Sequence, residues 1–239
     1  MTFWNSSQIK ECRSLEEYNK IKKLDKSKLK DDYYKLEVYS INILNKFGKK
    51  VTNRQRVLST ASVYLKRFYL FNNYLETDLY LIIITCLYLS SKVEELPLSI
   101  KYITNEFNKQ FKTTYKIQDI SKMEFNLIND LDYNLVVYHP DFRQFHLEDK
   151  INNLCYYILN DIYKTNLLLL FQPYTISIAI IVFAYSIQNN TEQSSQLLSQ
   201  LNADLDIIQY IIQEILKLYK LLPTIVDNDI YDLYLNSHF

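Results

Sequence analysis

The stretch LYLIIITCLYLSSKVEEL, residues Leu79–Leu96, is uncharged as far as Ser91 and then carries a lysine and two glutamates. A helix that is apolar on nearly every side belongs at the centre of a bundle, where its neighbours cover it. The charged end departs from this pattern, because acidic groups at a helix C-terminus face the negative end of the helix dipole and lose about 0.3–1 kcal/mol each. The stretch therefore predicts a helical bundle and, at its end, a place to look for function.

The sequence on either side of this stretch predicts further helices. Apolar residues recur at helical spacing before Gly48, which we expect to stop the first helix, and again from 53 to 71. Thr77 is the expected N-cap of the central helix, and weaker patterns predict helices at 100–111 and 117–131. With one glycine and four prolines, the chain has few residues that break helices.

The same succession occurs a second time further along the chain. An amphipathic pattern covers 151–162, a nearly uncharged segment follows Pro173, and apolar residues three and four apart run from Leu205 to Leu222. No strand pattern competes with these helices. The residues alone therefore predict an all-α chain of two helical bundles, each arranged around one apolar central helix.

Charge and composition exclude several classes of protein. The 27 basic and 27 acidic residues cancel, so net charge favours neither a nucleic-acid binder nor an anionic-membrane binder. The segment from Leu167 to Ile187 is uncharged and about as long as a bilayer span of roughly 20 residues. Gln172 and Pro173 interrupt it, which favours a buried helix of a soluble protein. The N-terminus lacks the basic and apolar regions of a secretory signal.

Residues for catalysis are missing from the sequence. His139, His146 and His238 lie near no serine or cysteine motif, and one glycine cannot build a phosphate-binding loop. The three cysteines have no metal-like spacing, which is typical of a protein from a reducing compartment. Neighbouring acids such as Glu94 and Glu95 are more often solvated than paired for acid–base catalysis. We therefore expect no enzyme, no cofactor and no metal site.

Two charges lie where helix geometry makes them costly. The stem of Lys92 follows an apolar face of the central helix, so its ammonium should emerge at the helix end. Glu124 shares a face with Ile120 and Leu127, and a carboxylate inside an apolar stripe needs a cation or backbone donors. Spacing alone leaves two alternatives open: Lys92 and Glu124 pair with each other, or an external partner uses them. Glu94 and Glu95 are likewise either solvated acids or groups that a partner neutralises.

Three segments together resemble the first cyclin box: RQRVLSTASVYLKRFY at Arg54–Tyr69, SSKVEE at Ser90–Glu95 and MEFNLINDLDYNL at Met123–Leu135. Within the cyclin family the chain resembles the cyclin C group, through FWNSSQ at Phe3–Gln8, VYHP at Val137–Pro140 and NDIYKT at Asn160–Thr165. The resemblance implies an all-α fold of two tandem five-helix cyclin boxes with an extra N-terminal helix. It divides the chain into an N-terminal helix and linker at 1–30, boxes at 31–136 and 137–222, and a short tail at 223–239.

The resemblance also implies partners and site residues. Cyclins bind a cyclin-dependent kinase and hold its mobile control helix in the active position. Members of the cyclin C group are regulatory subunits of the kinase module of Mediator, which acts on RNA polymerase II transcription in the nucleus. The residues that match the kinase-binding motif are Lys92, Glu94, Glu95 and Glu124, with both acids of the VEE motif expected to meet kinase arginines.

A second surface is implied for another Mediator kinase-module subunit. The residues that match this groove are Trp4, Asn160, Asp161 and Tyr219. Taken without the resemblance, Trp4 could anchor the N-terminal helix to the core, and Asp161 could pair with Lys164 three residues on.

Three other functions stay open at this point. A cyclin H-like subunit of the kinase-activating kinase shares KRFYL and similar helix breaks, although FWNSSQ and VYHP argue against it. A double-box general transcription factor would bind DNA through Lys46, Lys49, Lys50, Arg54 and Arg56, which the zero net charge disfavours. An all-helical enzyme has the weakest support. The basic run at Lys20–Lys30 is a weak signal for nuclear targeting and favours a solvated linker.

Overall fold

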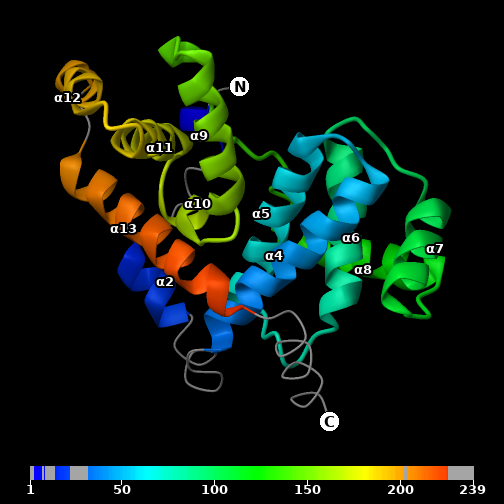
Figure 1. Cartoon of the computed structure of the whole chain (residues 1–239). Helices are drawn as coiled ribbons and strands as arrows, with labels where there is room; N and C mark the ends of the chain where they lie inside the picture. Colours follow the sequence, from blue (N-terminus) through cyan, green and yellow to red (C-terminus); the bar gives the residue numbers. More distant parts are fainter. Residues whose placement is uncertain (1–2, 7, 9–13, 22–31, 202–203, 226–239) are drawn as a thin grey trace. The chain divides into compact units, whose positions relative to one another are not determined.

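The computed structural model describes residues 3–6, 8, 14–21, 32–201 and 204–225. Within these residues the secondary structure consists of α- and 3-10 helices without a strand, as Figure 1 shows, so the all-α prediction is confirmed. The chain divides into two compact units between Val137 and Tyr138. One unit begins at Ser14, and the described residues before Ser14 group with the unit that begins at Tyr138.

The first unit contains a five-helix repeat built around α6. Its helices are α4 (Asp32–Val51), α5 (Gln55–Phe71), α6 (Leu79–Val93), α7 (Ile100–Phe111) and α8 (Ile117–Asp130). Helix α6 contacts each of the other four, and its residues Ile83, Ile84 and Leu87 are fully buried. The central position that its apolar sequence predicts is thus confirmed. A short helix, α2 (Leu15–Ile21), packs against α5.

The N-cap of α6 is Asp78, so the prediction of Thr77 is wrong by one residue. The Asp78 side chain accepts hydrogen bonds from the backbone N–H groups of Tyr80 (3.0 Å) and Leu81 (3.2 Å). Both residue types cap helices well, and an ionised carboxylate gains additionally from the positive end of the dipole. Thr77 instead donates its hydroxyl hydrogen to Asn73 O, at 3.0 Å.

The prediction that Gly48 stops a helix is also wrong, because α4 continues through it to Val51. A Cβ atom built at Gly48 would collide with Leu58 Cδ2 on α5. A larger residue at Gly48 would therefore require Leu58 to move, so glycine here favours the close approach of two helices, and its backbone is helical.

The second unit contains another five-helix repeat, built around α11. Its helices are α9 (Asp149–Ile162), α10 (Leu167–Leu170), α11 (Pro173–Ile187), α12 (Thr191–Gln200) and α13 (Leu205–Leu221). Helix α11 contacts each of the other four, as α6 does in the first unit. The uncharged segment that resembled a membrane span is broken at Phe171, whose backbone is extended, before Pro173 begins α11. No helix among the described residues reaches the length and apolarity that crossing a bilayer requires.

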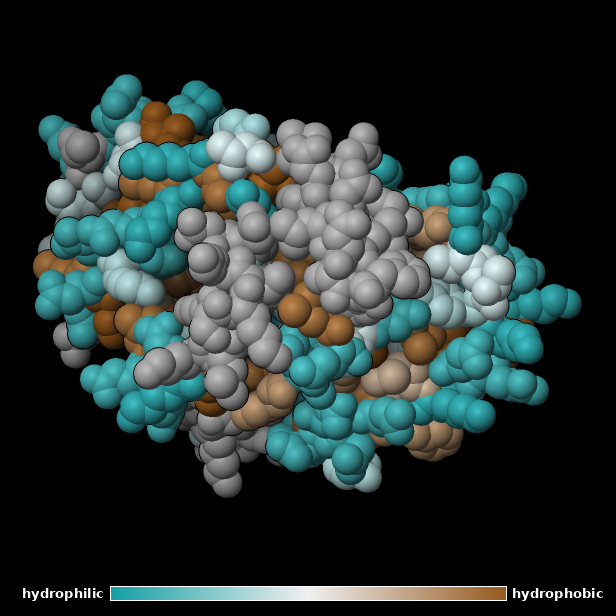
Figure 2. Space-filling view, turned by 90° about the horizontal axis from the view of Figure 1, so that it is seen from below, coloured by the Kyte–Doolittle hydropathy of each residue, from teal (hydrophilic) through white to brown (hydrophobic). Residues whose placement is uncertain are grey.

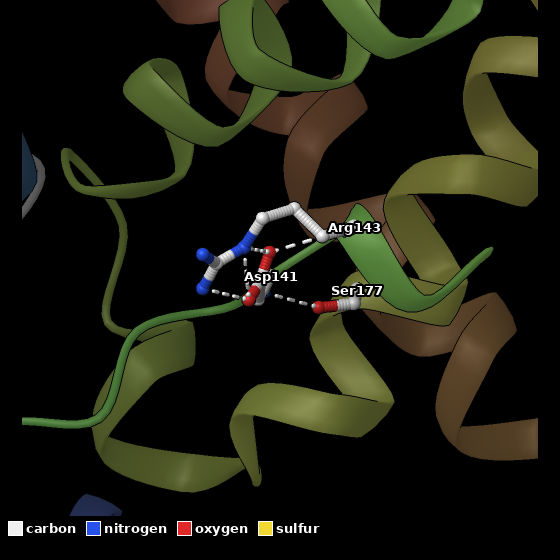
Figure 3. Close-up of polar contacts among 3 residues, drawn as sticks. All are labelled: Asp141, Arg143 and Ser177. Carbon is white, nitrogen blue, oxygen red and sulfur yellow. Dashed lines mark hydrogen bonds and ion pairs between the residues drawn. The ribbon is translucent and has the colours of Figure 1, made fainter. Parts of the chain in front are cut away.

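Two sets of polar contacts fix the start of the second unit. Figure 3 shows the Asp141 carboxylate accepting hydrogen bonds from the Arg143 guanidinium, with Nη2 at 2.6 Å, while the Asp141 backbone N–H donates to Ser177 Oγ on α11. The Arg143 hydrogen bonds lower the pKa of Asp141 below its usual range. Gln8 binds both backbone groups of Tyr138, accepting from its N–H at 2.6 Å and donating to its carbonyl at 3.2 Å. The N-terminal segment is thus tied to the chain just after the division between units.

The surface of the described residues is mainly polar and contains small apolar patches. Figure 2 shows hydrophilic side chains distributed over the described part of one face, with apolar groups between them. Single exposed apolar residues are normal on a folded protein, so the informative ones are those that adjoin a predicted site.

Candidate partner-binding sites

Lys92 and Glu124 form an ion pair between α6 and α8. Lys92 Nζ lies 2.6 Å from Glu124 Oε1, and the ring of Tyr88 lies 5.1 Å from the same nitrogen. The Glu124 side chain is 10% exposed and the Lys92 side chain 44% exposed. The hydrogen bond to Glu124 raises the pKa of Lys92, so the ammonium stays charged at neutral pH. Of the two alternatives left open by the sequence, internal pairing occurs in the structure.

The pair retains hydrogen-bonding capacity that a partner can use. An ammonium has three N–H donors and a carboxylate accepts about four hydrogen bonds. Within the described part of the chain, Lys92 donates one hydrogen bond to Glu124, and its nitrogen otherwise faces the Tyr88 ring. Internal pairing and use by an external partner are therefore compatible.

Glu94 also has partners in its own unit, both from α5. It is the C-cap of α6. Its Oε1 accepts a hydrogen bond from Thr60 Oγ1 at 2.6 Å, and its Oε2 lies 2.5 Å from Arg56 Nε. The Glu94 side chain is 10% exposed, whereas the Arg56 side chain is 69% exposed. A cation thus offsets the unfavourable helix dipole, and in this structure it comes from the chain itself.

Sequence reasoning missed the roles of Arg56 and Thr60. The available signal was their spacing, since residues four apart share one face of a helix. Which helix end this face meets depends on how α5 packs against α6, and the spacing does not contain that information.

Glu95 is exposed and adopts a left-handed backbone, with φ of 57°. The backbone N–H of the next residue, Leu96, bonds Ser91 O at 2.9 Å, which closes the helix end as a Schellman motif. Glycine or asparagine is favoured at this position because a β-carbon is disfavoured there. The structure places Glu95 beside Glu94 without burying it.

Two exposed aromatic residues lie on α8 and just after its end. Phe125, next to Glu124, is 74% exposed, and Tyr133, just after α8, is 72% exposed with φ of 59°. From α5, the Tyr64 hydroxyl and the Arg67 guanidinium bond the carbonyls of Leu135 and Asn134, which fixes the backbone after Tyr133. Aromatic residues are enriched at protein interfaces, so these two are further candidates for a contact with a partner.

The second predicted surface lies on the second unit, where Asp161 and Tyr219 meet. Tyr219 OH donates to Asp161 Oδ2 at 3.4 Å, and Lys164 Nζ lies 2.8 Å from Asp161 Oδ1, so the local pair that spacing suggested is present. Burial and the nearby Asp161 carboxylate raise the pKa of Tyr219 to about 12. Asn160 is exposed beside Asp161 on α9.

Trp4 lies in a 3-10 helix (Phe3–Asn5) and is 59% exposed. The neighbouring Phe3 contacts Tyr138 of the same unit, with their ring centroids 6.1 Å apart. The residue after Tyr138 is His139, whose Nδ1 lies 2.6 Å from the hydroxyl of Tyr163 at the end of α9. A series of contacts thus connects the N-terminal segment to the α9 end that carries Asn160 and Asp161.

Other candidate groups are placed as follows. Two of the five basic residues named for DNA binding are paired, Lys50 with Glu106 at 2.7 Å and Arg56 with Glu94. Burial raises the pKa of the Cys155 thiol to about 12, and it also raises the pKa of the Cys86 thiol above its usual value. Within the described part of the chain, no three His, Cys, Asp or Glu side chains are grouped to hold a metal. Cys12, His238, most of the basic run (22–30) and the tail from 226 lie outside the described residues.

Comparison with known proteins shows which family the chain resembles. Residues 4–136 match the family described as Cyclin, N-terminal domain. Cyclin-C1-1 of Arabidopsis thaliana is 32% identical, with 95% of this chain and 94% of the relative covered. Cyclin-C of Rattus norvegicus is 33% identical, with 82% and 79% covered. A chain in the solved yeast TFIIK (Kin28/Ccl1/Tfb3) complex shares the fold, with a TM-score of 0.69 at 18% identity over 89% of this chain and 98% of that chain.

The family match, the relatives that align over most of the chain and the two helical repeats agree with one another. They establish that the chain belongs to the cyclin family, within which it is similar to cyclin C.

Proposed function

We propose that this chain is the regulatory, non-catalytic subunit of a cyclin-dependent kinase that acts in RNA polymerase II transcription. Its relatives are cyclin C proteins, and the fold recurs in a transcription-associated kinase complex. The kinase-binding residues are Lys92, Glu94, Glu95 and Glu124, all at the end of α6 or on α8 of the first repeat.

One observation carries this proposal: Lys92 and Glu124 form an ion pair within the chain, and the lysine side chain of this pair is partly exposed to solvent. The Lys92 side chain is 44% exposed, and its ammonium donates one hydrogen bond to Glu124. A pair held only for stability would gain little in this position, since half-exposed ion pairs contribute about 0–1 kcal/mol. If a partner removes water from the pair and supplies further hydrogen bonds, the same two charges can contribute much more to the free energy of binding.

The mechanism is a population shift in the kinase. A kinase control helix with two positions occupies whichever one its partner binds more tightly. Lys92 and Glu124 hold each other in place across α6 and α8, so the surface offered to that helix is ordered before binding. Less conformational entropy is then lost on association. No covalent bond changes in this chain.

The finer assignment is that the kinase is the Mediator-associated one, in the nucleus, and that a second surface binds another subunit of the Mediator kinase module. The residues of this second surface are Trp4, Asn160, Asp161 and Tyr219. The hydrogen bond from Tyr219 to Asp161 supports a shared surface on α9 and α13, and the exposed Trp4 supports an aromatic contact for a partner.

A reciprocal charge swap tests the kinase-binding site. The double variant Lys92→Glu, Glu124→Lys keeps an ion pair between α6 and α8 but exchanges the charges that face the kinase. We expect the free energy of unfolding to change by no more than about 1 kcal/mol. The affinity for the Mediator-associated kinase should fall at least about 30-fold, because exchanged charges oppose the kinase groups. Calorimetry or surface-based binding with the purified kinase measures this.

The matched control is the swap Lys50→Glu, Glu106→Lys. This pair also joins two helices of the first repeat, and the Lys50 side chain is 43% exposed, like Lys92. It should leave kinase affinity unchanged. Equal binding by the Lys92/Glu124 swap and the wild type would overturn the proposal, and capture of the kinase-activating kinase alone would favour the cyclin H-like alternative.

A further inference from the structure

We infer that Arg56 pairs with the Glu94 carboxylate in the free chain and is displaced when a guanidinium of the kinase binds that carboxylate. Thr60 keeps the carboxylate oriented throughout. This inference rests on the proposed function, and it assigns roles in kinase binding to two residues that are not among the kinase-binding residues named above. It follows from the unequal surroundings of the two Glu94 oxygens.

Oε1 of Glu94 is held from the protein interior. Thr60 is fully buried in the second turn of α5 and donates its hydroxyl hydrogen to this oxygen at 2.6 Å. A β-branched side chain in a helix has few χ1 rotamers, so a buried threonine is a firm donor. The carboxylate is therefore oriented by a group that solvent and partners do not reach.

Oε2 of Glu94 is held from the surface. Arg56 lies one turn before Thr60, and its Nε is 2.5 Å from this oxygen although the side chain is 69% exposed. Arginine has five N–H donors in a planar fork, and this contact uses the one on Nε. An exposed ion pair on a flexible stem contributes little to stability, so a partner can replace it at small cost.

We expect displacement because both oxygens of the Glu94 carboxylate already have a partner, Thr60 at Oε1 and Arg56 at Oε2. Thr60 approaches from the buried side, and the exposed side of the carboxylate is the side that Arg56 occupies. A kinase guanidinium that binds Oε2 from the exposed side needs that position, because only 10% of the Glu94 side chain is exposed. Arg56 thus keeps Glu94 neutralised at the wrong end of a helix dipole until a partner's cation takes over.

The test is a double-mutant cycle on the affinity for the purified Mediator-associated kinase. Arg56→Gln should raise the affinity about two- to fivefold, since displacing an exposed pair costs no more than that factor. In a Glu94→Gln background the same Arg56→Gln change should have no effect, because nothing remains to compete for. Arg54→Gln is the matched control, since it removes a positive charge two residues away and should leave the affinity unchanged.

Thr60 is tested as a positioning residue by conservative rescue. Thr60→Val keeps the shape of the side chain without the hydroxyl and should lower the affinity about threefold or more, while Thr60→Ser restores it. Equal losses in both, matched by equal losses of melting temperature, would mean that Thr60 acts through packing alone.

The failure of this inference is distinguishable from that of the proposed function. A wild-type chain that does not bind the kinase would overturn both. Normal wild-type binding with unchanged affinity in Arg56→Gln would overturn the displacement alone. A loss of affinity in Arg56→Gln that persists in the Glu94→Gln background would also overturn it and make Arg56 a direct kinase contact.

Discussion

The two repeats are built alike at their centres and differently at the ends of their central helices. Helices α6 and α11 are both 15 residues long, largely apolar, and in contact with the four other helices of their repeats. Both end with a residue in the left-handed conformation, Glu95 with φ of 57° and Asn189 with φ of 58°. In both, the next backbone N–H reaches back five residues, from Leu96 to Ser91 and from Asn190 to Tyr185.

The residues that occupy this common geometry are what separates the repeats. The α6 end carries Lys92, Glu94 and Glu95, whereas the α11 end from Ile187 to Asn190 carries no charge. Asparagine tolerates the left-handed conformation well and glutamate does not. The second repeat therefore follows the rules of helix termination, and the first departs from them in the same position. Departures of this kind are places to look for functional residues, and these ones coincide with the residues proposed to bind the kinase.

The largest expected effect tests the equivalence of the two centres. Ile83→Ala in α6 and Ile180→Ala in α11 each remove a fully buried side chain from a central helix. Each should lower the free energy of unfolding by about 2–5 kcal/mol, because transfer and cavity costs add. Urea denaturation followed by circular dichroism measures both. A cost below 1 kcal/mol in either repeat would show that its central helix packs less tightly than its partner's.

An intermediate effect tests whether the two partner surfaces are separate. The swap Asp161→Lys, Lys164→Asp keeps the ion pair at the end of α9 but exchanges its charges. We expect binding of the other Mediator kinase-module subunits to weaken at least about tenfold, with kinase affinity unchanged. Co-purification with each partner measures the two losses. If kinase binding weakened equally, the assignment of one surface to each repeat would be wrong.

The smallest effect concerns the left-handed residues themselves. Glu95→Gly relieves a β-carbon at positive φ and should raise the free energy of unfolding by about 0.5–1 kcal/mol, while lowering kinase affinity. Asn189→Gly in the second repeat should change stability by only a few tenths of a kcal/mol. Thermal denaturation compares the two. A gain at Asn189 as large as that at Glu95 would remove the argument that the first repeat tolerates strain for function.

Most of the fold could be predicted because helices are local. The pattern at 100–111 coincides with α7, and both central helices follow from their apolar composition. Helix α12 was missed because its sequence, TEQSSQLLSQ, is mostly polar and has no continuous apolar stripe. The role of Gly48 was missed for another reason: the same residue serves as a helix stop or as a point of close approach, and only the position of Leu58 decides between them.

The candidate site was predictable one helix at a time. The faces of Lys92 and Glu124 follow from spacing, and Glu124 is buried as its stripe requires. That the two meet, and that Arg56 meets Glu94, depends on how α5 and α8 pack against α6, which no single-helix pattern encodes. Sequence reasoning therefore recognised which charges were out of place but could not say which other residues neutralise them.

The exposed Trp4 has a practical consequence. It is the single tryptophan of the chain, and it stands in the segment tied to Tyr138. The single tryptophan thus lies in the unit that holds the proposed Mediator surface, and none lies among the described residues proposed to face the kinase. The wavelength of Trp4 fluorescence can therefore report binding at that surface without an attached label.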